Sequence, residues 1–322
     1  MSSQAAPSAV PFIVKGKTAI VTGGGSGINL AFAKLLASRD CNVVIADIAL
    51  RPEAEEFLSN HKGENGGARV AFVETDVTSW KAINRMFEFT LAEFGDFDIV
   101  CPGAGVYEPH WSSFWHPPGS PESKDKVDGD RYALLDLNLT HPIRSTQLAI
   151  AHWLHPRPPA NPNFAKPSPA SLQNPKRVVH ISSVAAQLPV FRTPMYGATK
   201  YAISGFVRCL TPLDGVGIGV TAVAPGIVKT PLWTEHPEKL VNLDEKQDAW
   251  VTPEEVAEAM VQCIEKEAGG TILEVGTDSV RPVSAFNDPG PDTNPARGLI
   301  ASNSQKGDDM VWGWLQDPNL WS

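Results

Sequence analysis

The segment KTAIVTGGGSGI, residues 17–28, decides the fold of this chain of 322 residues. Residues 17–21 predict a buried strand, and the glycine-rich turn at 22–28 leads into a helix that we expect to begin near Leu30. Glycines at a strand-to-helix turn let the backbone approach a pyrophosphate, which the N-terminus of the helix then stabilises. The segment therefore predicts the first strand, turn and helix of a dinucleotide-binding sheet.

A carboxylate follows at the place where such a site needs one. The second predicted strand, residues 41–46, ends at Asp47, twenty positions after Gly27. A carboxylate there accepts hydrogen bonds from the hydroxyls of the adenine ribose, and it would repel a 2′-phosphate. The turn itself supplies no cation for such a phosphate. We therefore expect NAD as the cofactor, with NADP as the alternative because Arg51 is close in sequence.

Three polar residues, Ser183, Tyr196 and Lys200, form a candidate acid–base group. Tyr196 and Lys200 are four positions apart, a step that puts both side chains on one face of a helix. Lys200 is then expected to favour the phenolate and to lower the pKa of Tyr196 from its ordinary value of about 10. Such a phenolate takes a proton from an alcohol, and the phenol returns one to a ketone. Ser183, thirteen positions before Tyr196, would hydrogen-bond the same substrate oxygen.

Short motifs along the chain form a wider pattern. They are TGGGSGI (22–28), Asp76-Val77, Gly103-Ala104-Gly105, Asn138, Ser183, YGATK (196–200) and PGIVKT (225–230). In this order the motifs resemble those of the classical short-chain dehydrogenase/reductases, over roughly residues 15–280. Within that family, the segment KTPLWTEHPEK (229–239) is most similar to 15-hydroxyprostaglandin dehydrogenase-like enzymes and fungal secondary-metabolite alcohol dehydrogenases.

The resemblance implies which residues react and which bind. It assigns catalysis to Asn138, Ser183, Tyr196 and Lys200. Lys200 would also bind the nicotinamide ribose, and the carbonyl of Asn138 would hold a water in a proton path to solvent. The dinucleotide would contact residues from several segments, namely Gly23, Ser26, Gly27, Ile28, Asp47, Ile48, Asp76, Val77, Gly103, Ala104, Gly105, Tyr196, Lys200, Pro225, Gly226, Val228 and Thr230.

Pro142 supports this role of Asn138, which lies four residues earlier in a long helix predicted over about residues 129–154. A proline in a helix clashes with the carbonyl four residues back and gives it no donor. Pro142 would therefore reinforce a break in the helix at the carbonyl of Asn138. Without the resemblance, the same pattern would indicate only a kinked helix.

Two positions depart from the family pattern. Asn29 replaces the third glycine of the cofactor turn, which normally permits close packing of the helix on the strand. We expect the fold to tolerate Asn29, although its amide could instead reach the pyrophosphate or ribose. The usual Asn-Asn-Ala-Gly after the fourth strand is Pro102-Gly103-Ala104-Gly105 here, so a structural asparagine side chain is lost.

Strands and helices alternate along the chain. Helices are expected between seven strands, which lie near residues 17–21, 41–46, 69–73, 97–101, 178–181, 219–223 and 271–275. Thr252-Pro253-Glu254-Glu255 is a capping box that predicts the start of the last helix. Alternation with short turns predicts an α/β fold: a single doubly wound Rossmann-type domain with a mostly parallel seven-stranded sheet.

We expect this catalytic domain to span residues 15–280, after a flexible N-terminus at 1–14. Residues 155–176 contain seven prolines and predict an exposed insertion at the edge opposite the active site. The C-terminal extension, residues 281–322, ends in a tryptophan-rich cluster. That cluster would dock on its own domain, cover a neighbouring subunit or close the pocket, and docking is favoured.

The composition of the chain argues against several classes of binding partner. The net charge of −9 and the pI near 5.4 argue against nucleic-acid and anionic-membrane partners, and no apolar run is long enough to span a bilayer. The four cysteines are scattered, which indicates free thiols, and the histidines show no ligand spacing, so we expect no metal. The N-terminus does not resemble a signal peptide. A cytoplasmic homodimer or homotetramer is expected, the assembly being implied by the family resemblance.

Together these features predict an NAD(P)-dependent oxidoreductase that interconverts a secondary alcohol and its ketone. Aromatic residues at 107–129 would wall the substrate pocket, and 231–250 would form a substrate lid, so we expect a bulky apolar substrate. NAD use suggests oxidation in the cell. The alternative is a catalytically weak dinucleotide sensor or scaffold, which would not need the serine, tyrosine, lysine and asparagine together. An epimerase or dehydratase is less favoured because no larger substrate domain is visible.

Overall fold

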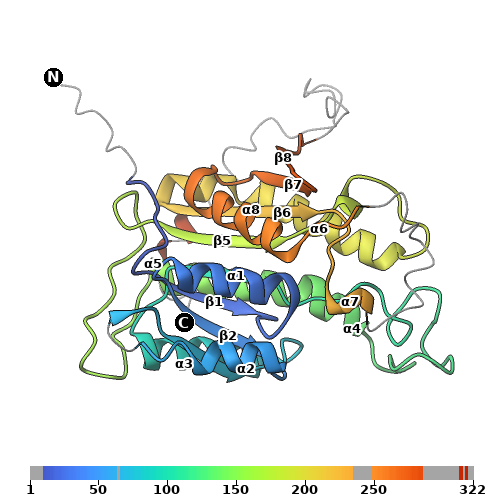
Figure 1. Ribbon diagram of the computed structural model, residues 1–322, viewed down its shortest axis with the longest axis horizontal. Coiled ribbons are helices and arrows are strands. Elements are labelled where there is room, and N and C mark those ends of the chain that lie inside the picture. The colour runs from blue at the N-terminus through green and yellow to red at the C-terminus, as the bar shows by residue number, and fades with distance from the viewer. Residues whose placement is uncertain (1–9, 64–65, 235–248, 286–311, 315, 318–322) are drawn as a thin grey trace.

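The computed structural model describes residues 10–63, 66–234, 249–285, 312–314 and 316–317 (Figure 1). Its centre is an eight-stranded sheet in the order β3-β2-β1-β4-β5-β6-β7-β8, parallel throughout except for the antiparallel pair β7–β8. The strand order reverses between β1 and β4, and this leaves a crevice at the carboxyl ends of the strands. The strands are β1 (Thr18–Thr22), β2 (Asn42–Asp47), β3 (Val70–Glu74), β4 (Ile99–Cys101), β5 (Lys176–Ile181), β6 (Ile218–Pro225), β7 (Ile272–Gly276) and β8 (Ser279–Pro282).

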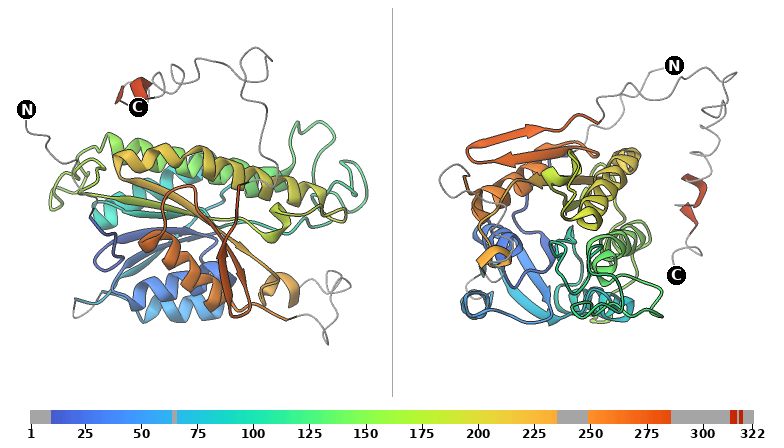
Figure 2. Two further views of the ribbon diagram at one scale, coloured as in Figure 1. Left: turned by 90° about the horizontal axis from the view of Figure 1, so that it is seen from above. Right: turned by 90° about the vertical axis from the view of Figure 1, so that its right-hand side faces the viewer.

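Helices cover both faces of this sheet (Figure 2). One face carries α1 (Gly27–Ser38), α2 (Pro52–Ser59) and α8 (Pro253–Lys266). The other face carries α3 (Trp80–Phe94), α5 (His141–Leu154) and α6 (Pro194–Cys209). Shorter pieces are α4 (Ala133–Leu135), α7 (Pro231–Thr234), the π-helix η2 (Asp136–Thr140), and the 3₁₀ helices η3 (Val184–Ala186) and η4 (Thr211–Val216). The doubly wound α/β prediction is therefore confirmed.

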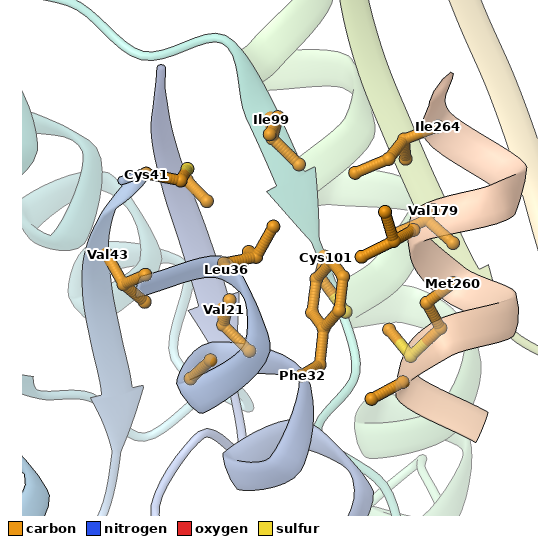
Figure 3. Packing of buried hydrophobic residues seen from close by; sticks show 14 of the residues in the cluster. Val21, Phe32, Leu36, Cys41, Val43, Ile99, Cys101, Val179, Met260 and Ile264 are labelled. Atoms are coloured by element: carbon orange, nitrogen blue, oxygen red, sulfur yellow. The ribbon is translucent and has the colours of Figure 1, made fainter. Parts of the chain in front are cut away.

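Each face of the sheet has its own apolar core. Figure 3 shows the first core, where Phe32 of α1 and Met260 of α8 meet the sheet beside Val21. The second core contains Trp153, whose indole N–H donates to the carbonyl of Phe97 at 2.9 Å. The strands read as continuous apolar runs because both of their faces are buried, as parallel sheets require.

Several predicted elements differ in detail. The sheet has eight strands rather than seven because Ser279–Pro282 folds back beside β7 as an exposed antiparallel edge. The long helix expected over residues 129–154 is divided into α4, η2 and α5, with the π-helix just before Pro142. Proline removes the donor that the α-helical pattern would need at this point. The capping box at Thr252 is confirmed by its two reciprocal hydrogen bonds with Glu255.

The N-terminal boundary of the packed chain differs from the predicted one, while the C-terminal cluster is described only in part. Phe12 and Val14 are buried in the first core, so the packed chain begins before residue 15. Trp312, from the predicted C-terminal cluster, packs against the second core, while Trp314 is half exposed. The rest of that cluster and residues 235–248 of the predicted lid lie outside the described residues. None of the helices in the described part of the chain combines the length and the apolarity that crossing a bilayer requires.

Candidate functional site

A cavity of about 410 Å³ opens at the carboxyl ends of the strands. It brings together residues from every cofactor segment that the resemblance implied: Gly23, Ser26, Gly27, Ile28, Asp47, Ile48, Asp76, Val77, Gly103, Ala104, Gly105, Tyr196, Lys200 and Thr230. Three other members of that set do not line it. Pro225 ends β6, and Gly226 and Val228 lie between it and Thr230 in the chain, with Val228 buried in the first core.

The glycine turn brings the backbone close to this cavity. Gly23 adopts a φ of 68°, and a Cβ on it would lie 2.8 Å from the Cα of Ala104. Gly27, with a φ of 55°, starts α1, whose first turn carries no acidic residue. Ser26, Gly27 and Ile28 line the cavity at the N-terminus of α1, where backbone N–H groups have no acceptor within the helix and the helix dipole is positive, which suits a pyrophosphate. The turn therefore fits a dinucleotide.

The Asp47 carboxylate is fixed at the rim of the cavity. Its Oδ2 accepts from the N–H of Gly25 at 2.9 Å, and its Oδ1 accepts from the N–H of Ile48 at 2.7 Å. A Cβ on Gly25 would lie 2.8 Å from Oδ2, so the carboxylate can approach the turn this closely only because residue 25 is a glycine. Arg51 and Asp76 line the same end of the cavity. This end thus offers an acceptor for ribose hydroxyls and one nearby cation.

The two departures from the family pattern touch each other. Asn29 is buried, and its amide packs against Gly23 and Gly103. A Cβ on Gly103 would overlap Asn29 Oδ1, so the side chain lost at 103 makes room for the one gained at 29. The thiol of Cys101 donates to the same Oδ1 at 3.8 Å. The expected tolerance of Asn29 thus has a physical basis, which is a reciprocal exchange of an asparagine and a glycine.

Tyr196 and Lys200 line the cavity, and Ser183 contacts Tyr196 without lining the cavity itself. Ser183 follows β5 and hydrogen-bonds the phenol of Tyr196, while its Oγ accepts from the N–H of Ala185 at 3.2 Å. Lys200 Nζ lies 5.4 Å from the centroid of the Tyr196 ring and donates to the carbonyl of Ile181 at 2.8 Å. The predicted four-residue step on one helix face accordingly places both side chains at the same cavity.

The expected effect of Lys200 on Tyr196 is wrong for this arrangement. Burial raises the pKa of Tyr196 to about 12, the hydrogen bond from Ser183 lowers it, and nearby Tyr107 raises it further. Burial also lowers the pKa of Lys200 to about 8. The spacing argument counted the charge of Lys200 but not the loss of water around both groups. Tyr196 is therefore a phenol at neutral pH, the form that donates a proton.

Asn138 lies in the π-helix and reaches the loop after β4. Its Oδ1 accepts from the N–H of Val106 at 2.9 Å, and its Nδ2 donates to the carbonyl of Val106 at 2.8 Å. A Cβ on Gly105 would lie 2.9 Å from Oδ1. The side chain of Asn138 thus anchors the loop that carries the cofactor motif, a contact in addition to the carbonyl role that the resemblance implied.

A buried polar link behind the turn escaped the sequence analysis. Thr22 Oγ1 accepts from the N–H of Ala104 at 3.1 Å and hydrogen-bonds His141 Nε2 at the same distance. Burial lowers the pKa of His141 to about 4, so this imidazole is neutral at physiological pH. His141 stands next to Pro142, but nothing in its sequence neighbourhood connects it to Thr22.

The loop after β4 forms the other wall of the cavity. Tyr107, Pro109 and Trp111 line it, together with Leu137, Pro231 and Leu232. The ring of Tyr107 contacts that of Tyr196 edge to face, with centroids 4.8 Å apart. The aromatic wall that the sequence predicted at 107–129 is thus next to the tyrosine.

One group of possible metal ligands occurs in the same loop, away from the histidines considered above. His110, His116 and Glu122 have potential ligand atoms within 4.8 Å of one another. His110 Nδ1 already hydrogen-bonds Glu122 at 2.6 Å. The second nitrogen of His116 is buried with no partner among the described residues, whereas metal-bound histidines normally donate there to an acceptor. The geometry favours an ion pair.

Comparison with known proteins places this site in a family. The family profile described as short chain dehydrogenase matches residues 17–240. A hydroxynaphthalene reductase-like protein of Metarhizium robertsii is 30% identical over 69% of this chain and 72% of its own. A cis-4-hydroxycyclohexanecarboxylate dehydrogenase of Sinomonas cyclohexanicum is 28% identical over 76% of this chain and 87% of its own. A 1-deoxy-11-beta-hydroxypentalenate dehydrogenase of Streptomyces avermitilis is 29% identical over 67% and 70%.

Solved structures agree on the fold. A short-chain dehydrogenase/reductase from Brucella melitensis, described as a glucose/ribitol dehydrogenase, superposes with a TM-score of 0.63 at 21% identity, covering 83% of this chain and 97% of its own. A 3-ketoacyl-(acyl-carrier-protein) reductase from the same organism, complexed with NADH, gives a TM-score of 0.61 at 22% identity, covering 82% and 98%. With its ordered motifs gathered around one cavity and its matching profile, the chain belongs to the short-chain dehydrogenase/reductase family of oxidoreductases.

Proposed function

We propose that the protein is an NAD-dependent dehydrogenase/reductase that interconverts a bulky apolar secondary alcohol and its ketone. The observation that carries the proposal is that Tyr196, which Ser183 hydrogen-bonds, lines together with Lys200 the cavity that the glycine turn also lines. A sensor or scaffold would need the turn but would have no use for a phenol hydrogen-bonded by a serine at this cavity.

Tyr196 is the general acid and base of this proposal. In the reductive direction its phenol donates the proton to the substrate oxygen, and in the oxidative direction the phenolate takes it back. Ser183 hydrogen-bonds the phenol and is close enough to orient the same oxygen. Burial raises the pKa of Tyr196 to about 12, so the group is a phenol at neutral pH, the form that donates the proton in reduction.

The cofactor proposal rests on the chemistry of the cavity rim. Asp47 Oδ1 and Oδ2 would accept from the adenine ribose, and the turn at Gly23–Ile28 would donate backbone N–H groups to the pyrophosphate. When bound, a nicotinamide supplies or accepts the hydride. The Asp47 charge supports NAD over NADP, and Arg51 at the same rim is the feature that supports the alternative.

The substrate class follows from the wall opposite Lys200. Tyr107, Trp111, Leu137 and Leu232 present aromatic and aliphatic surface to the cavity. Such a wall binds a carbon skeleton larger than a small polyol by excluding water from apolar area. The relatives named after a hydroxynaphthalene, a cyclohexanecarboxylate and a pentalenate act on ring compounds by their names, which agrees with a cyclic substrate.

The proposal is tested by following the absorbance of reduced nicotinamide with purified protein. NAD, NADP and their reduced forms are combined with ring-containing secondary alcohols and ketones and with small polyols. We expect turnover with NAD(H) and a ring compound, and weaker turnover with polyols. Binding of NAD without turnover across the panel would favour the sensor, and better turnover of polyols would refute the substrate class. Light scattering of the same sample tests the homodimer or homotetramer that the family resemblance implies.

A further inference from the structure

Glu108 is a buried carboxylate that the proposed chemistry does not use. It lies on the loop after β4 and is only 5% exposed. A carboxylate out of water requires hydrogen-bond donors, and Glu108 has three. Oε2 accepts from the N–H of Tyr196 at 2.8 Å, while Oε1 accepts from the N–H of Phe114 at 2.9 Å and from Ser113 Oγ at 3.3 Å.

These donors belong to two different elements, α6 and the loop after β4. Tyr196 is in the first turn of α6, where backbone N–H groups have no acceptor within the helix. Glu108 supplies the missing acceptor, and its negative charge faces the positive end of that helix. Phe114 and Ser113 belong to the loop itself. The two oxygens of one carboxylate thus join the backbone of the proposed catalytic tyrosine to the loop whose Tyr107 and Trp111 line the cavity.

Neighbouring contacts reinforce this junction. Tyr107, the residue before Glu108, packs its ring against that of Tyr196. On the far side, the indole N–H of Trp115 donates to the carbonyl of Phe191 at 3.0 Å, and the two rings lie 5.0 Å apart. The loop therefore contacts α6 twice at Tyr196 and contacts the segment that leads into α6 at Phe191.

We propose that Glu108 is a positioning residue that sets the distance between Tyr196 and the aromatic wall of the cavity. This inference rests on the proposed function for its catalytic consequence. Both oxygens are needed, because one accepts from α6 and the other from the loop. Glu108→Gln keeps the size of the side chain but leaves a single accepting oxygen, so one of the two connections must be lost.

The first test needs no substrate. Hydrogen–deuterium exchange measures how strongly the Tyr196 amide is protected from solvent. The acceptor of this amide is Glu108, because the first turn of the helix offers none. Because the remaining oxygen of Gln can face either donor, the Phe114 amide is followed as well, and we expect one of the two amides to exchange about tenfold faster or more in Glu108→Gln, in line with the loss of a hydrogen bond to a charged group. Glu122→Gln is the matched control, because Glu122 is an exposed carboxylate of the same loop that hydrogen-bonds His110. Exchange equal to that of the wild type at both the Tyr196 and the Phe114 amides would overturn the inference.

The second test separates positioning from stability. In Glu108→Gln we expect kcat/KM for a bulky ring substrate to fall about tenfold more than for a small alcohol, with the Kd for NAD unchanged. Equal losses for both substrates would indicate a merely structural role and overturn the inference. If Glu108→Gln does not fold, Trp115→Phe tests the same junction, because it removes the indole N–H and keeps an aromatic ring. If no alcohol is turned over at all, the proposed function fails, while the exchange result still decides the role of Glu108.

Discussion

The cavity has two sides that are built in opposite ways. The turn side, residues 22–28 with Asp47, is made of backbone and one carboxylate, all within thirty residues of chain. The loop side, residues 107–116 with Tyr196, is made of side chains from segments about ninety residues apart, joined by Glu108. A local motif fixes the turn side, whereas long-range hydrogen bonds fix the loop side. The first side therefore suits a ligand common to the family, and the second can vary with the substrate.

The largest expected effect removes the proposed acid–base group of the loop side. Tyr196→Phe deletes the phenol oxygen and keeps the ring that packs against Tyr107. We expect turnover to fall by about 10²–10⁴-fold, the usual contribution of a positioned acid or base, while NAD affinity changes far less. Steady-state kinetics and nucleotide titration measure the two quantities.

Tyr201→Phe is the matched control for that variant. Tyr201 lies five residues further along the same helix, is half exposed and does not line the cavity. Its activity should equal that of the wild type. If Tyr196→Phe kept more than about a tenth of the wild-type turnover, this tyrosine would not be the general acid and base.

The next effect concerns the turn side alone. Asp47→Asn keeps the size of the side chain and an acceptor for Gly25, but it removes the charge. Hydrogen bonds to a charged group contribute about 1.5–3 kcal/mol, so NAD affinity should fall about 10–100-fold. NADP affinity should rise, because the repulsion of a 2′-phosphate is lost. Isothermal titration with both nucleotides measures the change in preference.

Glu74→Gln controls for the loss of a carboxylate at this edge. Glu74 is the register partner of Asp47 on β3, but it does not line the cavity. It should leave both affinities unchanged. An unaltered NAD-to-NADP ratio in Asp47→Asn would show that another group selects the cofactor, with Arg51 as the first candidate.

A smaller effect tests whether the turn side tolerates the family's usual residues. Gly103→Asn places a Cβ onto Asn29 Oδ1, and such overpacking should lower the free energy of unfolding by about 1–3 kcal/mol. In the Asn29→Gly background the space is free, and Gly103→Asn should lower the free energy of unfolding much less. Urea denaturation of the wild type, the two single variants and the double variant gives the coupling energy, expected at about 1–2 kcal/mol.

Gly205→Asn is the control for adding an asparagine to this protein. A Cβ on Gly205 meets no atom within 4 Å. Gly205→Asn should therefore change the free energy of unfolding only slightly, and by the same amount with or without Asn29. Additive effects of Gly103→Asn and Asn29→Gly would contradict the reciprocal exchange.

The same contrast explains which parts of the fold and of the site could be predicted from the sequence. The glycine turn, Asp47 and the step from Tyr196 to Lys200 all depend on local periodicity or short spacing, and the structure places each of them at the cavity. Of the predicted cofactor residues, only Pro225, Gly226 and Val228 do not line it. Glu108 could not be found in this way, since its partner Tyr196 is eighty-eight residues away. The raised pKa of Tyr196 depends on burial by the whole fold, which no pair spacing contains. The edge strand β8 was missed because its four exposed residues carry no apolar pattern.

The smallest expected effect is a shift in pH dependence, and it concerns the hydrogen bond between Ser183 and Tyr196. The hydrogen bond from Ser183 lowers the pKa of Tyr196 against the burial that raises it. Ser183→Ala should raise that pKa further, so the phenolate needed for oxidation forms only at higher pH. A hydrogen bond of about 1 kcal/mol corresponds to a shift of somewhat less than about one pH unit.

The measurement is kcat/KM for oxidation from neutral to alkaline pH. In the wild type the rate should rise with pH, because the phenolate fraction grows as the pH approaches the pKa of about 12. The profile of Ser183→Ala should move toward higher pH, while reduction near neutrality keeps its phenol donor. Ser145→Ala, which removes a buried hydroxyl without a partner among the described residues, should leave the profile in place. A shift toward lower pH in Ser183→Ala would mean that Ser183 stabilises the phenol rather than the phenolate, and the loop side would then owe its proton chemistry to Tyr107 and burial alone.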